Sequence, residues 1–253
     1  MGFVEKFTLQ LRRGEGRFFG ALLRTLKYLM HANLPVPPLL RPAFRMLYEF
    51  HFAVKHGFRW LYNFLYCEPA FRCRCTKVGR NLHVWLMPDV SSHTRIYIGD
   101  NVNIFGHMGI LSGRIFDDPT LFIGNNVDIG HNVVFTINKS VTIEDHVNIA
   151  SNVFILDNDA HPRDPYLRAS KHPPSPDEIK PVRICKYAWI GQGSYIMKGV
   201  TIGEGAIIGA NSVVLNDIPA FSVAIGNPAR VIVKDIRANA PAQGAPQPEP
   251  AKV

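Results

Sequence analysis

The sequence predicts a parallel β-solenoid that follows an α-helical N-terminal region. Aliphatic residues recur every six positions over most of residues 78–219, one long Pro-rich stretch interrupts this repeat, and the first 80 residues differ from the rest in charge and aromatic content. A period of six fits neither the 3.6-residue period of a helix nor the two-residue period of a simple strand. It fits a short strand and a turn that repeat along the chain.

The first 80 residues are basic and aromatic. They carry 14 of the 28 Lys and Arg but only 4 of the 20 Asp and Glu, and they hold 15 of the 27 aromatic residues. In residues 1–30 and 43–66, apolar and basic side chains alternate at helical spacing, which is typical of amphipathic helices on an anionic membrane surface. We therefore expect residues 1–77 to be helical and to contact a membrane. The alternative is that their aromatic side chains pack against the solenoid or another subunit.

The composition also limits the compartment and the partners. With 47 % hydrophobic and 19 % charged residues, the chain is too apolar to be disordered. No segment has the roughly 18 uncharged apolar residues of a membrane span, and no secretory signal peptide is recognisable. We expect a cytoplasmic protein, peripheral on the inner face of the cytoplasmic membrane, with four reduced Cys. The basic charge is confined to one end, so no nucleic acid is expected. Cys73-x-Cys75 lacks the gap of common zinc sites, so no metal is expected.

The six-residue repeat is strictest in residues 182–219. Its opening aliphatic residues there are Ile184, Ile190, Ile196, Ile202, Ile208 and Val214. The same frame occurs upstream in blocks of three, namely Val78, Val84 and Val90, then Ile98, Ile104 and Ile110, then Ile123, Ile129 and Phe135, then Ile143, Ile149 and Ile155. Three units would close a triangular coil of about 18 residues, with the aliphatic side chains pointing inward and stacking from coil to coil. Gly, Asn and Asp are expected at the corners, where positive φ is needed.

One loop, residues 156–181, interrupts the coils. It is polar and Pro-rich, and it contains His161 and His172. Long loops on a rigid scaffold commonly carry function. His161 follows soon after the last inward aliphatic residue and is expected at the root of the loop, whereas His172 lies further out among prolines. The β-helical domain is predicted to span residues 78–236, and residues 237–253, rich in Ala and Pro, are predicted to form a disordered tail.

The segment from Val141 to Ile236 resembles the hexapeptide-repeat O-acetyltransferases. Its landmarks are VTIEDHVNIASNVFI, the dipeptide His161-Pro162, and then AWIGQGS, GVTIGEGAIIGANSVV and DIPAFSVAIGNPARVI. These resemble the galactoside and maltose O-acetyltransferases and the O-acetyltransferases of bacterial polysaccharide and lipopolysaccharide assembly. The resemblance implies a left-handed parallel β-helix, assembly as a homotrimer with the cofactor between neighbouring solenoids, and an O-acetyltransferase that uses acetyl-CoA as its acyl donor.

The resemblance assigns His161 as the general base. A neutral imidazole would take the proton of a sugar hydroxyl as that hydroxyl attacks the thioester, and the backbone N–H of Gln192 would stabilise the oxyanion. An acidic group is expected to orient the imidazole, and Asp157, Asp159 and a backbone carbonyl all stay open for this role. The two acids are placed on the acceptor side of the site. Asn138 joins them, because it stands where the galactoside enzymes have an acceptor-contacting Asp.

Acetyl-CoA is expected to lie along the coils of residues 189–216. The resemblance assigns its contacts to Trp189, Gly191, Gln192, Ala210 and Arg230. Lys198 and Lys234 are further candidates, because the pyrophosphate and the 3′-phosphate need cations. For each Lys the alternative is a solvated surface charge, and Gly191 and Ala210 could serve only the packing of the corners.

The expected acceptor is a carbohydrate hydroxyl on a precursor of a cell-surface polysaccharide or lipopolysaccharide. A lipid-linked acceptor fits a membrane-bound N-terminal region. Two alternatives remain, namely an N-acyltransferase that acts on a nucleotide-linked amino sugar and a β-helical scaffold without catalytic activity.

Overall fold

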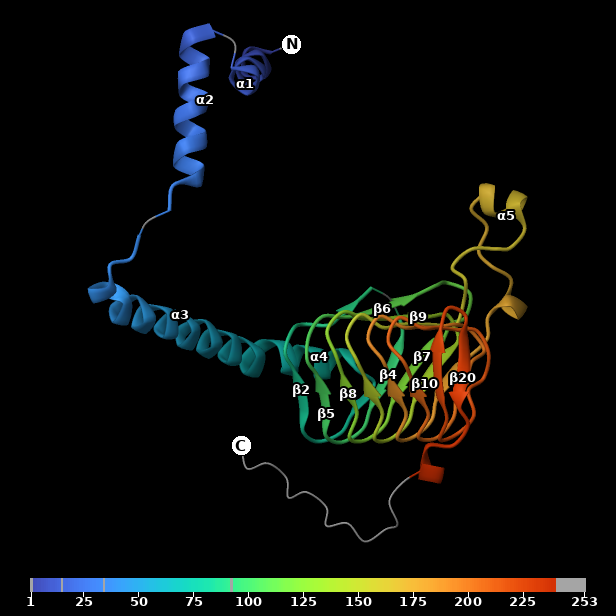
Figure 1. Cartoon of the computed structure of the whole chain (residues 1–253). Coiled ribbons are helices and arrows are strands. Elements are labelled where there is room, and N and C mark those ends of the chain that lie inside the picture. The colour runs from blue at the N-terminus through green and yellow to red at the C-terminus, as the bar shows by residue number, and fades with distance from the viewer. Residues whose placement is uncertain (1, 15, 34, 92, 240–253) are drawn as a thin grey trace. The chain divides into compact units, whose positions relative to one another are not determined.

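The structure is a computed structural model that describes residues 2–14, 16–33, 35–91 and 93–239. The chain divides into two compact units, Met1–His56 and Gly57–Val253, and each is described by itself (Figure 1). The division falls within α3 (Arg41–Tyr62). Residues 57–77, which the sequence places in the N-terminal region, therefore belong to the unit that holds the coils. The predicted tail lies outside the described residues from position 240 onward, and its first residues close a short 3₁₀ helix, η4 (Ile236–Asn239).

The first unit is helical, as predicted. It contains α1 (Phe3–Arg13), α2 (Gly16–His31), the 3₁₀ turn η1 (Pro38–Leu40) and the first part of α3. Gly14 ends α1 with a φ of 62° in the left-handed region, where glycine has no Cβ penalty. The Phe7 and Phe19 rings then meet edge to face, with centroids 5.4 Å apart. None of the described side chains of this unit is buried.

The second unit opens with the end of α3, and short helices then close one end of the coils. The π-helical turn η2 (Asn63–Cys67) leads into α4 (Glu68–Arg74). The Phe71 side chain from α4 is buried in the hydrophobic core together with residues of the first coil. Asn63 Nδ2 donates a hydrogen bond to the carbonyl oxygen of Trp85, 3.1 Å away. These helices therefore cover apolar side chains that a solenoid would otherwise expose at its end.

Three sheets form the faces of the coil. Their strands are parallel, except that β20 pairs antiparallel with β19. The first sheet comprises β1 (Lys77–Val78), β4 (Arg95–Ile98), β7 (Thr120–Ile123), β10 (Ser140–Ile143), β13 (Val182–Ile184) and β16 (Thr201–Ile202). The second comprises β2 (Leu82–Val84), β5 (Val102–Ile104), β8 (Asp128–Ile129), β11 (Asn148–Ile149), β14 (Trp189–Ile190), β17 (Ile207–Ile208), β19 (Val223–Gly226) and β20 (Ala229–Val233). The third comprises β3 (Asp89–Val90), β6 (Met108–Ser112), β9 (Val133–Ile137), β12 (Phe154–Leu156), β15 (Tyr195–Ile196) and β18 (Val213–Val214).

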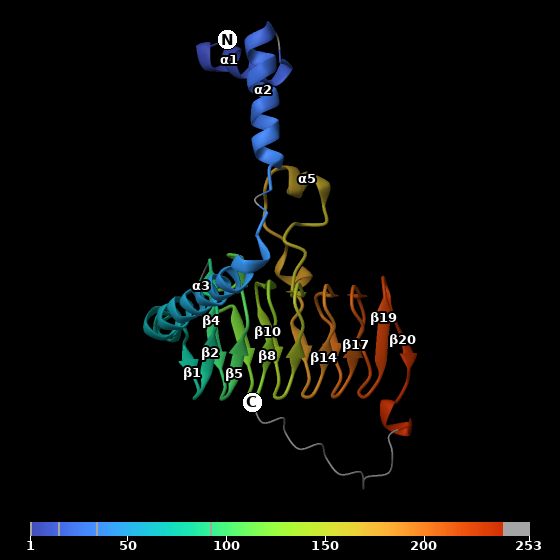
Figure 2. The same cartoon turned by 60° about the vertical axis from the view of Figure 1, so that its left-hand side comes forward.

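From β1 to β18 the chain visits the three sheets in turn, so each circuit adds one strand to each sheet, and β19 and β20 then extend the second sheet alone (Figure 2). The six-residue frame sets the register between circuits. Ile123, Ile143 and Ile184 pair on the first sheet. Ile149 pairs with Ile190 on the second. The predicted parallel β-solenoid with a helical N-terminal region is therefore confirmed.

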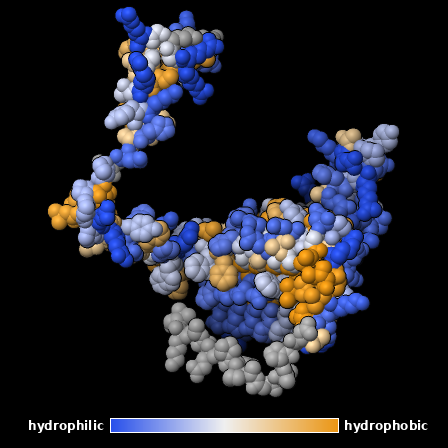
Figure 3. Space-filling model, in the orientation of Figure 1, coloured by the Kyte–Doolittle hydropathy of each residue, from blue (hydrophilic) through white to orange (hydrophobic). Residues whose placement is uncertain are grey.

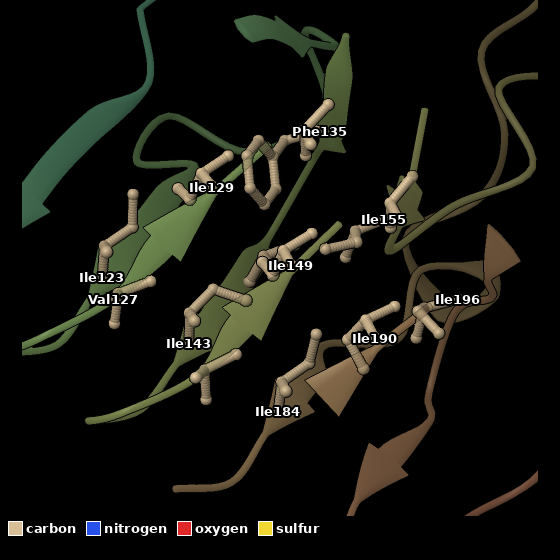
Figure 4. Packing of buried hydrophobic residues seen from close by; sticks show 14 of the residues in the cluster. Ile123, Val127, Ile129, Phe135, Ile143, Ile149, Ile155, Ile184, Ile190 and Ile196 are labelled. Atoms are coloured by element: carbon tan, nitrogen blue, oxygen red, sulfur yellow. The ribbon is translucent and has the colours of Figure 1, made fainter. Parts of the chain in front are cut away.

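The aliphatic residues of the repeat form one continuous core (Figure 4). Their side chains point into the prism from all three sheets and stack on their counterparts in the next circuit. Burying one such side chain contributes about 1.5–3 kcal/mol. The stacked column of isoleucines is therefore the main source of stability in this unit.

The residue types at the corners of the coils differ in part from those predicted. Asn and Gly occupy many positions of positive φ, as expected, but no Asp within the described ranges does so. Asp instead precedes such a position, and its carboxylate accepts a backbone N–H from the previous coil, as Asp100 does from Arg80 and Asp145 from Asn125. One corner carries the bulky residues His146 and Tyr187 at positive φ, and their rings stack with centroids 4.9 Å apart.

Candidate active site

The loop that carries His161 begins and ends at one point of the prism. It leaves β12 at the corner between the third and first sheets and projects from the coils, with α5 (Pro165–Ala169) at its far end (Figures 1 and 2). The N–H of Lys180 donates to the carbonyl oxygen of Asp157 at 2.9 Å, and the N–H of Gly199 donates to the carbonyl oxygen of Lys180 at 3.0 Å. The loop is therefore a closed excursion whose two ends are tied to each other and to the next coil.

Asp157 anchors the root of this loop. Its carboxylate is fully buried and accepts hydrogen bonds from the backbone N–H groups of Asn138, Lys139 and Ser140, at distances of 2.6–3.0 Å. The side-chain amide of Asn158 donates to it as well, at 2.7 Å. Burial raises the pKa of the Asp157 carboxyl, and the four donors lower it in part. The carboxylate is therefore committed to the turn at residues 138–140.

His161 stands on a fixed stretch of backbone but presents its ring to solvent. The Asn158 side chain is buried, and its Oδ1 accepts the N–H of Ala160 at 2.8 Å. Ala160 has a φ of 63°, a conformation that a non-glycine residue keeps only when its surroundings hold it. Pro162, on the other side of His161, is buried, and its carbonyl oxygen accepts from Arg168 at 3.1 Å. The imidazole is exposed and makes no hydrogen bond within the described chain.

Asp159 is paired with Lys198. The Lys198 Nζ lies 2.5 Å from Oδ2 of Asp159, and Arg163 Nε lies 3.7 Å from the same oxygen. Lys198, which the sequence analysis offers as a cation for the coenzyme A phosphates, therefore forms an ion pair with a carboxylate at the root of the loop. This pairing could not be read from the sequence, because 39 residues separate the two partners.

Asn138 lies inside the chain rather than on an open surface. It is 4 % exposed, and its Oδ1 is buried without a hydrogen-bond partner among the described atoms. A Cβ placed on Gly113 would come within 1.8 Å of this oxygen, so Gly113 leaves the space that the amide fills. The position predicted for acceptor contact is thus covered by the preceding coil.

The residues predicted to bind acetyl-CoA lie at another corner, between the second and third sheets. Trp189 is exposed on the outer surface of β14. Gly191 lies so close to the next coil that a Cβ would stand 2.5 Å from the carbonyl oxygen of Ile208, which gives this glycine a packing role. Arg230 is exposed on β20, where its guanidinium donates to the carbonyl oxygen of Ala229 at 2.9 Å.

The backbone N–H of Gln192 is available for a ligand. In an earlier coil, the N–H of His131 at the equivalent corner donates to Oγ of Ser151 in the coil that follows, at 3.0 Å. In the coil that follows Gln192, the position equivalent to Ser151 is occupied by Ala210, which has no oxygen in its side chain. Among the residues that the structure describes, none accepts a hydrogen bond from the Gln192 N–H. An unoccupied N–H at a rigid corner is the type of donor that stabilises an oxyanion.

Within a single chain, the loop that carries His161 and the corner that carries Gln192 lie at different edges of the prism. The His161 loop leaves at the corner between the third and first sheets, whereas Gln192 and Ala210 lie at the corner between the second and third sheets. The outer surface of the third sheet, where the Phe154 and Tyr195 rings stack with centroids 4.8 Å apart, lies between them.

All four cysteines are free thiols. Burial raises the pKa of the Cys75 thiol to about 12, so this thiol stays protonated at neutral pH. Over the described ranges, no three His, Cys, Asp or Glu side chains are grouped so that they could hold a metal ion.

Asn158 is a site residue that the repeat frame does not reveal. Its side chain links Asp157 to Ala160 and thereby shapes the backbone before His161. The available signal was local, since Asn commonly hydrogen-bonds a backbone N–H two residues on.

The sequence comparisons agree with the repeat. Residues 181–216 match the family described as bacterial transferase hexapeptide (six repeats), and residues 121–157 match the hexapeptide repeat of succinyl-transferase. Galactoside O-acetyltransferase of Escherichia coli is 38 % identical over 122 residues, which cover 46 % of this chain and 58 % of that protein. The Saccharomyces cerevisiae protein YJL218W, named as a proposed acetyltransferase, is 41 % identical over 114 residues, covering 45 % of this chain and 56 % of that one. The chain thus spans little more than half the length of these curated relatives.

The comparison of structures supports the fold. A variant of AntD, an N-acyltransferase from Bacillus cereus in complex with dTDP and coenzyme A, superposes with a TM-score of 0.53 at 22 % identity. The match covers 67 % of this chain and 90 % of AntD. The repeats, the three parallel sheets and these similarities together identify a left-handed parallel β-helix of hexapeptide repeats, which is similar along its coils to acetyltransferases of the hexapeptide-repeat type.

Proposed function

We propose that the protein transfers the acetyl group of acetyl-CoA to a carbohydrate hydroxyl, on a precursor of a cell-surface polysaccharide or lipopolysaccharide. The observation that carries this proposal is the placement of His161, whose exposed imidazole stands on backbone held by the buried residues Asn158 and Pro162. The similarity to galactoside O-acetyltransferase along the coils supports a hydroxyl group as the acceptor.

The chemistry assigns a role to each group. An imidazole nitrogen of His161 takes the proton of the sugar hydroxyl as the hydroxyl oxygen attacks the thioester carbonyl carbon. The N–H of Gln192 donates to the oxyanion of the tetrahedral intermediate. The C–S bond then breaks, and the imidazolium returns the proton to the departing thiolate. The products are an O-acetyl sugar and free coenzyme A.

The donor would lie along the corner that carries Trp189, Gly191 and Ala210, with Arg230 toward the nucleotide end. The exposed ring of Trp189 and the small side chain at position 210 leave room for a pantetheine arm. An Arg guanidinium can form paired hydrogen bonds with a phosphate, which suits the exposed Arg230.

A second copy of the chain would complete the site. His161 and Gln192 belong to different corners of one prism. We propose that the base of one copy meets the donor corner of its neighbour. Apolar side chains that a neighbour could cover are exposed on β19 and β20, namely Ile225, Val231 and Ile232, and Figure 3 shows a hydrophobic surface over β20. These features support self-association of the chain, and we propose the homotrimer that the resemblance implies.

An assay of thiol release tests the proposed activity. The full chain is incubated with acetyl-CoA and a panel of oligosaccharides, and free coenzyme A is measured with a thiol reagent. We expect release that depends on a hydroxyl acceptor, with an O-acetyl ester in the product by mass spectrometry. An amide product from an amino sugar would favour N-acylation instead, and no transfer to any acceptor would favour a scaffold.

The exposed apolar side chains of the first unit support the proposal that it contacts an anionic membrane. Its helices bury no described side chain, so large apolar residues such as Phe18, Met30, Leu39 and Phe50 stay exposed. Helices that bury nothing gain little stability from propensity alone and need an apolar surface. In the described part of the chain, no helix is long and apolar enough to cross a bilayer. We propose that the unit lies on the inner face of the cytoplasmic membrane, near a lipid-linked acceptor.

Vesicle flotation tests this membrane contact. We expect the full chain to float with vesicles that contain phosphatidylglycerol. Replacing Arg17, Arg24 and Lys27 of α2 by Gln should weaken binding about 100-fold, because each basic residue near an anionic surface contributes roughly 1 kcal/mol. The matched control removes three charges from the second unit, at Lys77, Arg114 and Lys186. Equal flotation of the two variants would contradict a membrane role for α2.

A further inference from the structure

One ion pair ties the His161 side of the loop to the coils. Lys198 Nζ and Asp159 Oδ2 are 2.5 Å apart, and the two side chains are only 10 % and 33 % exposed. The comparable pair on the neighbouring corner, Lys186 and Glu204, is 3.6 Å apart, and its Lys is 51 % exposed. A short pair that is shielded from water holds its geometry more firmly than a solvated one.

The position of this pair relates it to the general base. Asp159 lies two residues before His161, directly after the buried Asn158. Lys198 lies in the corner after β15, next to Gly199, whose N–H binds the far end of the loop through the carbonyl oxygen of Lys180. The corner at residues 198–199 therefore holds both ends of the loop, one through a side chain and the other through the backbone.

A role of Lys198 in binding coenzyme A phosphates fits this environment poorly. Its ammonium group is already neutralised by Asp159, and almost all of its side chain is covered. A phosphate would have to displace the carboxylate and reach a shielded nitrogen. The exposed guanidinium of Arg230 presents no such obstacle.

We propose that Lys198 is a positioning residue for His161 and does not bind the acyl donor. It holds Asp159, and through Asp159 it fixes the backbone on which the imidazole stands. The expected effect on turnover rests on the proposed function, whereas the role of the Lys198–Asp159 ion pair in holding the loop does not. A small displacement of a general base lowers the rate of the chemical step and leaves donor binding intact.

Steady-state kinetics separate the two roles. In Lys198→Met, we expect kcat to fall about 10- to 100-fold, while KM for acetyl-CoA changes less than about two-fold. Asp159→Asn should behave alike, the double variant should be no worse than either single one, and Lys198→Arg should recover most of the activity. Lys186→Met, which breaks the exposed pair, is the matched control and should keep the activity of the unsubstituted chain. A raised KM for acetyl-CoA with an unchanged kcat in Lys198→Met would overturn the proposal.

Limited proteolysis gives a readout that is independent of turnover. Trypsin can cleave the loop after Arg163, Arg168 or Lys171, all of which are exposed. We expect Lys198→Met to be nicked there several-fold faster than Lys186→Met, because the root of the loop opens more often. Equal nicking of the two variants would overturn the proposed tie. If the unsubstituted chain transfers no acetyl group, the proposed function fails, but the nicking rates still decide whether Lys198 holds the loop.

Discussion

Replacing His161 by Ala is expected to lower kcat for acetyl transfer by about 10²–10⁴-fold, the usual contribution of a positioned general base. Without the imidazole, the sugar hydroxyl has to attack the thioester while it still holds its proton. The exposed ring makes no hydrogen bond within the described chain, so its removal should leave the stability of the β-helix unchanged. Turnover by thiol release and a thermal melt, measured on the same preparation, check both parts of this prediction.

The same loop contains a matched control for His161. His172 is also exposed, but it lies further along the loop, where its Nδ1 and the hydroxyl of Ser170 are 3.0 Å apart. His172→Ala should therefore keep nearly full kcat. Full activity in His161→Ala, or a loss confined to His172→Ala, would remove His161 from the mechanism.

Replacing Asp157 by Ala should destabilise the second unit by about 3 kcal/mol, since a buried donor left without a partner costs roughly 1–3 kcal/mol. Three backbone N–H groups, those of Asn138, Lys139 and Ser140, lose their acceptor in this variant. The loop root should open at the same time, so acetyl transfer should fall along with stability. The expected readouts are a decrease in Tm of roughly 5–10 °C and faster amide exchange at residues 138–140.

Two further variants separate the lost hydrogen bonds from other effects. Asp157→Asn keeps the volume and one oxygen acceptor, so its loss of stability should be smaller than that of Asp157→Ala. Asp217 accepts one backbone N–H, from Thr201, at an exposed corner. Asp217→Ala should therefore cost about 1 kcal/mol or less, because water can replace the acceptor. An unchanged Tm in Asp157→Ala would show that the carboxylate does not anchor the turn.

The coils could be predicted from the sequence because their period is a direct consequence of packing. An inward side chain is needed once per face, so Ile184, Ile190 and Ile196 each start a six-residue unit, and all three are fully buried. The handedness of the coil could not be predicted in this way, since the spacing of residues is the same in a left-handed and a right-handed coil. It followed from the resemblance and from the comparison of structures.

The loop and its contacts could be predicted only in part. The place of His161 at the root of the loop follows from its distance to the last inward residue. The partners of Asp157 and Asp159 could not be predicted, because they come from neighbouring coils. Which residues face each other there depends on the path of the loop between the coils. The buried environment of Asn138 was missed for the same reason, since it depends on Gly113 in the preceding coil.

The hydrogen bond between Lys180 and Asp157 has a consequence for how such enzymes can diversify. Since the two ends of the excursion already meet, the outer part of the loop, residues 164–179, can be shortened, lengthened or exchanged without altering the spacing of a single coil. Under the proposed function, such a change would alter acceptor preference while His161 and the donor corner stay in place. Grafting residues 164–179 onto another hexapeptide enzyme is expected to transfer acceptor selectivity.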